Sequence, residues 1–425
     1  MSDRRRIGQI RCTPVLVPDP PLRNSSGVHE PWVARLIIEV ESIDGNVGLS
    51  ETFGDPMLVS AIVERAPLLI GHDPFDLAGM QQIIGVGRSR EANGQSWIGA
   101  LPAPGKFAGS LEAKILAAFE CALIDLQARM LGVPVSTVLG GRTRDSVDFA
   151  AYLFYKFGHH IDADEDDLWG EVSSPEDMVH LAEQMVELYG FRSLKLKGGV
   201  LDPDEEVATI VALRERFPGM PLRIDPNAAW SVSTSVRVGR ALTGVLEYLE
   251  DPTPGHPGMA EVARAVDVPL ATNMIVTAFG DIQEAVRQGS ASIVLADHHF
   301  WGGLRATQHL ATVCETFGIG LSMHSNSHLG ISFAAMTQVA STLAGQLHAC
   351  DTHYPWQETD VVVERLKIDG GAVRLTDAPG LGVELDRERL AELHENHLRF
   401  GPMRRDDVGY MRRYVPGWED ARPRW

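Results

Sequence analysis

Two lysines lie two residues apart in an apolar stretch, FRSLKLK, at residues 191–197. Side chains on a strand alternate between its two faces, so Lys195 and Lys197 would point the same way, with their Cα atoms about 6.5 Å apart. Two ammonium groups on one desolvated face repel each other, and burial disfavours the charge on each. Such a pair is either an edge-strand feature exposed to water or a source of a basic amine at an active site.

Hard oxygen donors lie at the ends of three later apolar runs. Asp225 ends PLRID, Glu250 ends LEYLE, and Asn273 lies near the end of VPLATNM. Carboxylate and amide oxygens suit Mg²⁺, which keeps its remaining positions for water or substrate oxygens. Two alternatives stay open in the sequence: Asp251 could point inward in place of Glu250, and Asn273 could instead cap the helix that follows.

A second base is predicted from His324, which follows the run IGLSM, with Asp297 at the end of the preceding run as the carboxylate that orients and stabilises its imidazole. A like charge about 6 Å away contributes about 2.8 kcal/mol at an effective dielectric of 20, so Lys195 would favour the neutral amine of Lys197. His298 and His299 lie beyond the strand end and are expected in a loop.

A metal ion beside two basic side chains indicates one class of chemistry. One base removes a proton from the carbon next to a carboxylate, and Mg²⁺ stabilises the resulting enediolate. The opposite residue then returns a proton, which gives epimerisation, or protonates a departing β-hydroxyl, which gives dehydration.

Eight short apolar runs, alternating with helical patterns, could position these groups. One strand, one helix and their loops fit the spacing between successive runs, so the pattern predicts a parallel (β/α) barrel, whose active site lies at the carboxyl ends of the strands. Polar residues end seven consecutive runs, and burying unpaired charges is costly, which disfavours the edge-strand interpretation of the lysines. The runs are VDFAAYLF (147–154), FRSLKLK (191–197), PLRID (221–225), LEYLE (246–250), VPLATNM (268–274), ASIVLAD (291–297), IGLSMHS (319–325) and HACDTH (348–353).

The segments on either side of the barrel have other patterns. Residues 1–145 combine alternating strands, joined by a turn at Asp44 and Gly45, with one long helix over 110–131, and so predict an α+β capping domain. The barrel is expected over residues 146–384. Residues 385–425 carry no further strand pattern and are expected to pack back on the capping domain.

Composition limits the partners of the chain. A formal net charge of −19 disfavours nucleic acid and anionic membranes, and an anionic substrate would need a locally cationic pocket. No apolar run is long enough to span a membrane or, after the basic start MSDRRRIGQI, to form a signal peptide. The 4 cysteines have no zinc-site spacing, so we expect a cytoplasmic protein with reduced thiols.

The motifs together resemble the enolase superfamily in its mandelate-racemase-like branch and, within that branch, the D-glucarate dehydratases. The resemblance covers most of the chain and includes the helix FECALIDLQARMLGVPVSTVLGG before the barrel. It implies the modified (β/α)7β form of the TIM barrel, an α/β fold, with the capping domain completed by the C-terminal tail. The matching segments are GFRSLKLKGGVL, RIDPNAAW, LEYLEDP, LATNMIVT, LADHHFW, MHSNSHLGIS, CDTHYPWQE and PGLGVELD.

The resemblance also implies a reaction and a set of roles. The reaction would be loss of water from D-glucarate to 5-dehydro-4-deoxy-D-glucarate, with the epimer L-idarate as a candidate second substrate, in a homo-oligomeric, Mg²⁺-dependent enzyme. Lys197 and His324 would be the bases and Asp297 the partner of His324. The metal ligands would be Asp225, Glu250 and Asn273. Substrate contacts would come from Asn24, His29, Ser96, Tyr152, Lys195, Asn227, Ser325, Asn326, His353 and Arg405.

Three departures from the dehydratase pattern bear on the substrate more than on the core chemistry. Ala228 replaces an expected glycine, His298 replaces an expected proline, and ETFGDPM (51–57) differs from the expected glycine-rich loop. The alternatives are a dehydratase or epimerase for another acid sugar, a Schiff-base aldolase that uses one of the lysines, and a low-activity paralogue that binds metal and partner subunits.

Overall fold

The capping domain is built on an antiparallel sheet. The computed structural model describes residues 3–85, 110–164, 166–345 and 347–425. Its first sheet has the order β1-β4-β5, formed by β1 (Ile7–Pro18), β4 (Trp32–Ser42) and β5 (Val47–Phe53). The predicted turn at Asp44 and Gly45 joins β4 to β5, and Gly45 has a φ of 88°, a left-handed conformation that favours glycine. A short two-stranded sheet, β2 (Arg23–Asn24) with β3 (Gly27–Val28), lies between β1 and β4 in the sequence.

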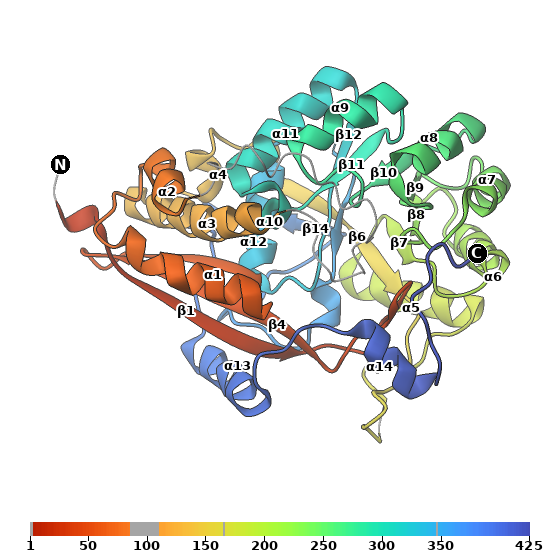
Figure 1. Ribbon diagram of the computed structural model, residues 1–425, viewed down its shortest axis with the longest axis horizontal. Helices are drawn as coiled ribbons and strands as arrows, with labels where there is room; N and C mark the ends of the chain where they lie inside the picture. Colours follow the sequence, from red (N-terminus) through yellow and green to blue (C-terminus); the bar gives the residue numbers. More distant parts are fainter. Residues whose placement is uncertain (1–2, 86–109, 165, 346) are drawn as a thin grey trace.

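The long helix predicted over 110–131 is α3 (Leu111–Leu131). Ser110 caps its first turn by accepting a bond from the Ala113 amide, and Gly132 ends it with a φ of 67°. This helix packs on β4 and β5, and Figure 1 shows it on the side of the sheet opposite α13 (Arg387–Phe400). The remaining elements of this region are η1 (Asp3–Arg5), α1 (Pro56–Arg65), η2 (Ala66–Leu69), α2 (Leu77–Ile83) and α4 (Val135–Val138).

All eight predicted barrel strands are present and pair in parallel in the order β12-β11-β10-β9-β8-β7-β6-β13. A parallel bridge between Leu321 and Leu347 closes the barrel between the two ends of this row. The short β14 (Ala372–Arg374) adds to β6 in the antiparallel direction. The strands are β6 (Ser146–Phe154), β7 (Leu194–Lys197), β8 (Leu222–Asp225), β9 (Tyr248–Glu250), β10 (Leu270–Thr272), β11 (Ile293–Ala296), β12 (Gly320–Met323) and β13 (Cys350–Thr352).

Helices follow each strand from β6 to β12, which is the predicted (β/α)7β arrangement (Figure 1). Local signals set their starts: Ser174 and Asp177 form a capping box at α5, and Asp202 and Glu205 form one at α6. The barrel helices are α5 (Pro175–Tyr189), α6 (Pro203–Arg216), α7 (Val232–Ala241), α8 (Gly255–Ala265), α9 (Phe279–Gln288), α10 (His298–Trp301), α11 (Leu304–Phe317) and α12 (Gly330–Thr342).

The C-terminal segment returns to the first residues of the chain. After η4 (Tyr354–Trp356), α13 packs on β1, and α14 (Asp407–Tyr414) packs on β3. The domain boundaries at residues 145 and 385 stay a prediction. In the part of the chain that the structure describes, no helix combines the length and the apolar character needed to cross a membrane.

Candidate active site

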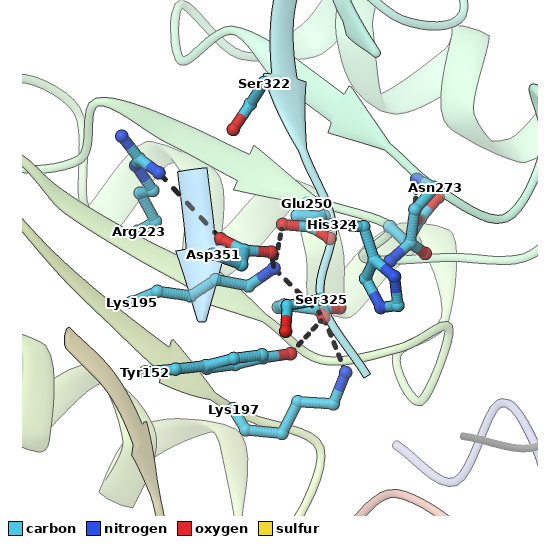
Figure 2. Close-up of polar contacts among 12 residues, drawn as sticks. Tyr152, Lys195, Lys197, Arg223, Glu250, Asn273, Ser322, His324, Ser325 and Asp351 are labelled. Carbon is cyan, nitrogen blue, oxygen red and sulfur yellow. Dashed lines mark hydrogen bonds and ion pairs between the residues drawn. The ribbon is translucent and has the colours of Figure 1, made fainter. Parts of the chain in front are cut away.

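Lys195 lies at the centre of a buried carboxylate cluster at the barrel rim (Figure 2). Its Nζ lies 2.6 Å from Glu250 Oε2, 2.6 Å from Asp351 Oδ2 and 3.7 Å from Asp225 Oδ2, and all four side chains have no solvent exposure. Burial lowers the pKa of Lys195, but the charges of Asp351 and Glu250 outweigh it and raise that pKa well above its usual value. Lys195 is therefore an ammonium group that ties β7 to β9 and β13, and the edge-strand interpretation is wrong.

Lys197 faces the same cluster. Its Nζ donates a bond of 2.6 Å to Asp225 Oδ2 and a second bond to Asn227 Oδ1. The Tyr152 ring lies 4.7 Å from Lys195 Nζ and 5.8 Å from Lys197 Nζ, and the Tyr152 hydroxyl lies 3.5 Å from Asp225 Oδ2. Each lysine Nζ thus contacts a carboxylate of its own, which offsets the mutual repulsion expected from the sequence.

Glu250, and not Asp251, points into the cluster. Asp251 has a φ of 37°, and its carboxylate turns toward β10, where it accepts bonds from the Thr272 hydroxyl and the Asn273 amide. Asn273 lies five residues before Ala278, the N-cap of α9, so it does not cap that helix. Asp251 instead fixes the backbone of Asn273 beside the cluster (Figure 2).

The cluster fits a divalent cation. Among the described residues, the carboxylates of Asp225, Glu250 and Asp351 contact the Nζ atoms of Lys195 and Lys197, and the Arg223 guanidinium lies farther away, 4.0 Å from Asp351 Oδ1. Burial raises the pKa of Glu250 well above its usual value, Lys195 opposes this rise, and the charges of Asp225 and Asp351 add to it. In the ranges that the structure describes, Glu250 Oε1 has no hydrogen-bond partner, and Oε2 lies close to Lys195 without hydrogen-bond geometry. A metal ion would satisfy these oxygens and hold the carboxylate ionised.

The loops after β7 and β8 are held in place by the Glu206 carboxylate and by a close contact between their backbones. Glu206 accepts backbone bonds from Gly199, Val200 and Leu201, directly after β7. Gly199 has a φ of 72°, and a Cβ there would lie 2.3 Å from the carbonyl oxygen of Pro226 after β8. Glycine is therefore required where the loops after β7 and β8 meet.

Asp297 and His324 form the predicted pair, with 3.5 Å between Asp297 Oδ2 and His324 Nδ1. The expectation of a loop for His298 and His299 is wrong, because both are buried in α10. His299 is the nearer partner of Asp297: its Nδ1 lies 2.7 Å from Oδ1, and its amide donates to the same oxygen. His328 adds a third imidazole, with Nε2 lying 3.7 Å from Asp297 Oδ2.

A second group of potential metal ligands consists of Asp297, His299 and His328, whose donor atoms lie within 4.8 Å of one another. Both ring nitrogens of His299 already have partners, since Nδ1 contacts Asp297 and Nε2 contacts the Glu51 carbonyl. Imidazole nitrogens are also poor ligands for Mg²⁺. The oxygen-rich cluster around Glu250 is therefore the better magnesium site.

Four further residues that were predicted to contact the substrate lie around this rim. The ring of His353 lies 4.8 Å from the ring of Tyr152, and within the described part of the chain its Nδ1 has no hydrogen-bond partner. Burial lowers the pKa of His353 well below its usual value, and positive charges nearby add to this. Ser325 accepts a bond from the His353 amide, Asn326 is half-buried, and Asn227 donates its amide to Asp225.

Next to Asn227, Ala228 has a φ of 61°, which explains why the dehydratase pattern has glycine there.

A separate group joins Asn24 to Arg405. The guanidinium of Arg405 donates two bonds to Asp407, and the Asn24 amide group donates a third to the same carboxylate. His29 pairs with Asp19 at 2.9 Å. These groups are satisfied within the protein, and their roles as substrate contacts stay predictions. Ser96 lies outside the described residues.

Sequence reasoning missed the main anchors of the site. The ion pair of Asp351 with Lys195, the contact of His299 with Asp297 and the position of His328 were not predicted. A spacing of two residues between Asp297 and His299 was the available signal, because an aspartate at an N-cap accepts from the amide two residues later.

Family profiles match both parts of this architecture. Residues 13–140 match the mandelate racemase / muconate lactonizing enzyme N-terminal domain, and residues 177–389 match the enolase C-terminal domain-like family. The chain belongs to the enolase superfamily. Within it, the chain is 52% identical to a "probable glucarate dehydratase" of Streptomyces coelicolor, over 99% of both chains. Family membership and this full-length match make the chain a hydro-lyase.

Solved structures of the superfamily have the same fold. An enolase of Pseudomonas fluorescens, crystallised with bound magnesium, potassium and tartrate, has a TM-score of 0.94 and 49% identity, over 99% of both chains. An enolase of Gibberella zeae, complexed with magnesium, formate and sulfate, has a TM-score of 0.93 and 46% identity, over 100% of this chain and 98% of that one.

Proposed function

We propose that this hydro-lyase removes water from D-glucarate to give 5-dehydro-4-deoxy-D-glucarate and accepts the epimer L-idarate. One observation carries the proposal: Lys197 and His324 reach the carboxylate cluster from different sides (Figure 2). Epimers present the α-proton on opposite faces of the same carbon, so two bases on different sides serve both substrates. The name of the Streptomyces coelicolor relative supports glucarate over other acid sugars.

Magnesium would be held by Asp225, Glu250 and Asn273. The ion supplies positive charge to the substrate carboxylate while the neighbouring carbon loses its proton. The relatives from Pseudomonas fluorescens and Gibberella zeae, which were crystallised with magnesium, support this choice of ion. Lys195 is charged and buried beside both acidic ligands, so it would hold the same substrate carboxylate in place.

Proton transfer would be divided between the two bases. His324 would take the α-proton of D-glucarate, and Lys197 would take that of L-idarate. His324 would then give a proton to the departing β-hydroxyl, which leaves as water, and the resulting enol rearranges to the 2-keto acid. Asp297 would keep the His324 ring in position during both transfers.

Arg405 would bind the distal carboxylate of a diacid, with Asn24 and His29 nearby. Its pairing with Asp407 neutralises its charge, so we expect the substrate to compete with Asp407 for the guanidinium. The homo-oligomeric state and the cytoplasmic location stay predictions.

A substrate panel with added Mg²⁺ tests the proposal. D-Glucarate, L-idarate, galactarate and gluconate are incubated with the enzyme, and formation of a 2-keto acid is measured. We expect product from D-glucarate and from L-idarate, and no product from either after EDTA treatment. The Lys197→Ala variant should give no product from L-idarate. Product from galactarate or gluconate, but not from D-glucarate or L-idarate, would indicate a dehydratase for another acid sugar. No product from any of the four acid sugars would indicate a low-activity paralogue.

A control excludes imine chemistry. Borohydride added with substrate would trap a lysine adduct if the enzyme were a Schiff-base aldolase. We expect no loss of activity and no mass increase, because Lys195 and Lys197 are both engaged with carboxylates.

A further inference from the structure

Across the residues that the structure describes, each polar atom that contacts the His299 ring can accept a hydrogen bond. Its Nδ1 lies 2.7 Å from Asp297 Oδ1. On the other side of the ring, Nε2 lies 2.9 Å from the carbonyl oxygen of Glu51 and 3.0 Å from the hydroxyl of Ser332. The side chain is only 1% exposed, so water does not replace these partners.

The hydrogen-bond partners determine how many protons the ring carries. A carboxylate oxygen and a carbonyl oxygen only accept. The Ser332 hydroxyl lies 3.2 Å from the Glu51 carbonyl oxygen and can donate its hydrogen there, so that its lone pairs are available to His299 Nε2. Both ring nitrogens of His299 must therefore donate, and a ring with two N–H groups is an imidazolium cation.

The His299 imidazolium contacts one of the two carboxylate oxygens of Asp297, Oδ1. Asp297 Oδ1 accepts both the ring and the amide N–H of His299, while Oδ2 is shared between His324 at 3.5 Å and His328 at 3.7 Å. Burial raises the pKa of Asp297, but the charge and hydrogen bond of His299, together with the nearby imidazoles of His324 and His328, bring it well below its usual value. The carboxylate is thus ionised, and its negative charge is already balanced before His324 gains a proton.

We propose that His299 is a positioning residue that stays protonated and balances the charge of Asp297. His324 thereby releases a proton more readily than the histidine of a simple His–Asp pair would. Balanced in this way, Asp297 orients the His324 ring without strongly stabilising its protonated form. This suits a residue that takes a proton as a base and must then release it to a leaving hydroxyl. The inference deepens the proposed dehydration and rests on the role assigned there to His324.

The capping domain holds the far side of this cation. Glu51 lies on β5, and its carboxylate pairs with Arg35 of β4 at 2.7 Å. The same carboxylate accepts the amides of Leu329 and Ser332 at the start of α12, a helix whose N-cap residue provides no side-chain bond. The backbone and side chain of Glu51 thus join the capping domain to both α10 and the loop that follows His324.

The other charged or titratable groups around His299 do not neutralise its positive charge. Arg35 and Glu51 neutralise each other. The ring of His298 is tilted by 36° against that of His299, with ring centroids 3.9 Å apart, and burial, followed by the charge of His299, lowers the pKa of His298 well below its usual value. Burial likewise lowers the pKa of His328 to about 4. Lys114 of α3 also acts electrostatically on Asp297, and burial lowers its pKa to about 8.

Neutron diffraction tests the protonation of His299 directly and independently of any substrate. Crystals of the full chain, exchanged into D₂O at pD 8, should show deuterium on both ring nitrogens of His299. Deuterium on only one of them would overturn the inference. Because this readout involves no turnover, it stands even if D-glucarate proves not to be a substrate.

The pH dependence of D-glucarate turnover tests the effect on His324. In His299→Gln the charge is lost but a hydrogen-bonding side chain remains, so the acidic limb of kcat/KM should move to higher pH by about one unit, a tenfold change in proton concentration. His298→Gln is the matched control, since that imidazole is equally buried and its Nδ1 lies 4.0 Å from Asp297 Oδ1. An unmoved limb in His299→Gln, or equal shifts in both variants, would refute the inference.

Discussion

Replacing Lys195 by methionine removes the positive centre of the carboxylate cluster while keeping most of the side-chain volume. The ammonium lies 2.6 Å from each of two carboxylate oxygens, and a single contact at that distance corresponds to about 6 kcal/mol of gross attraction at an effective dielectric of 20. Desolvation offsets much of this, and breaking a buried pair by removing one partner costs about 3–5 kcal/mol. For a chain of this length that corresponds to a fall in Tm of about 4 °C in EDTA.

Magnesium should restore the stability of Lys195→Met more than it stabilises the parent protein. The carboxylates left without an ammonium bind a cation more tightly, and a ligand present at a hundred times its Kd adds about 2.7 kcal/mol. The assay is thermal unfolding of both proteins across a Mg²⁺ titration. Lys156→Met is the matched control, since Lys156 is also fully buried and pairs with Asp167 at 2.9 Å. Its loss of stability should be unaffected by Mg²⁺.

Two results would refute this reasoning. If Lys195→Met were as stable as the parent protein in EDTA, the cluster would not depend on the ammonium for its charge balance. If the stabilisation by Mg²⁺ were the same in the parent protein, Lys195→Met and Lys156→Met, the ion would bind away from Asp225 and Glu250.

Three further predictions concern exchange chemistry, loop geometry and acid stability. His324→Asn should lose D-glucarate turnover but retain exchange of the α-hydrogen of L-idarate with D₂O, measured by NMR; loss of both would mean that the bases do not act independently. Glu206→Gln replaces a carboxylate that accepts three amides, so it should lower stability by about 2 kcal/mol in urea unfolding and raise KM, and an unchanged Cm would contradict this. Opposed by burial, hydrogen bonds from His348 and Arg223 still lower the pKa of Glu247 to about 2. Its stabilisation is thus present above about pH 4.5 and is lost as pH falls toward 2, so the deficit of Glu247→Gln, about 2 kcal/mol at pH 6, should shrink over that range, and a constant deficit would contradict this.

Strand positions and the grouping of the oxygen donors at one rim could be predicted because they depend on local patterns. Apolar runs of five to eight residues predict the barrel strands, and the carboxyl ends of parallel strands meet at one rim. Asp225 and Glu250 could therefore be grouped before any coordinates existed. Lys195 and Lys197 could be placed on one face because side chains alternate along a strand.

Contacts between distant segments could not be predicted in the same way. The choice between Glu250 and Asp251 depended on a left-handed backbone at Asp251, which the sequence does not signal because the residue is not glycine. Placing His299 next to the Glu51 carbonyl required the packing of the capping domain on the barrel, across 248 residues of sequence. Arg405 differs from these examples because its partner is local. The resemblance assigned its guanidinium to substrate binding, but in the structure that guanidinium pairs with Asp407, two residues away.

Anomalous diffraction from crystals grown with Mn²⁺ in place of Mg²⁺ tests the central claim most directly, because manganese marks the position of the ion without reference to turnover. A single strong peak within coordination distance of Asp225, Glu250 and Asn273, facing Lys197 on one side and His324 on the other, is the predicted result. A peak at Asp297, His299 and His328, or none near Glu250, would contradict the account.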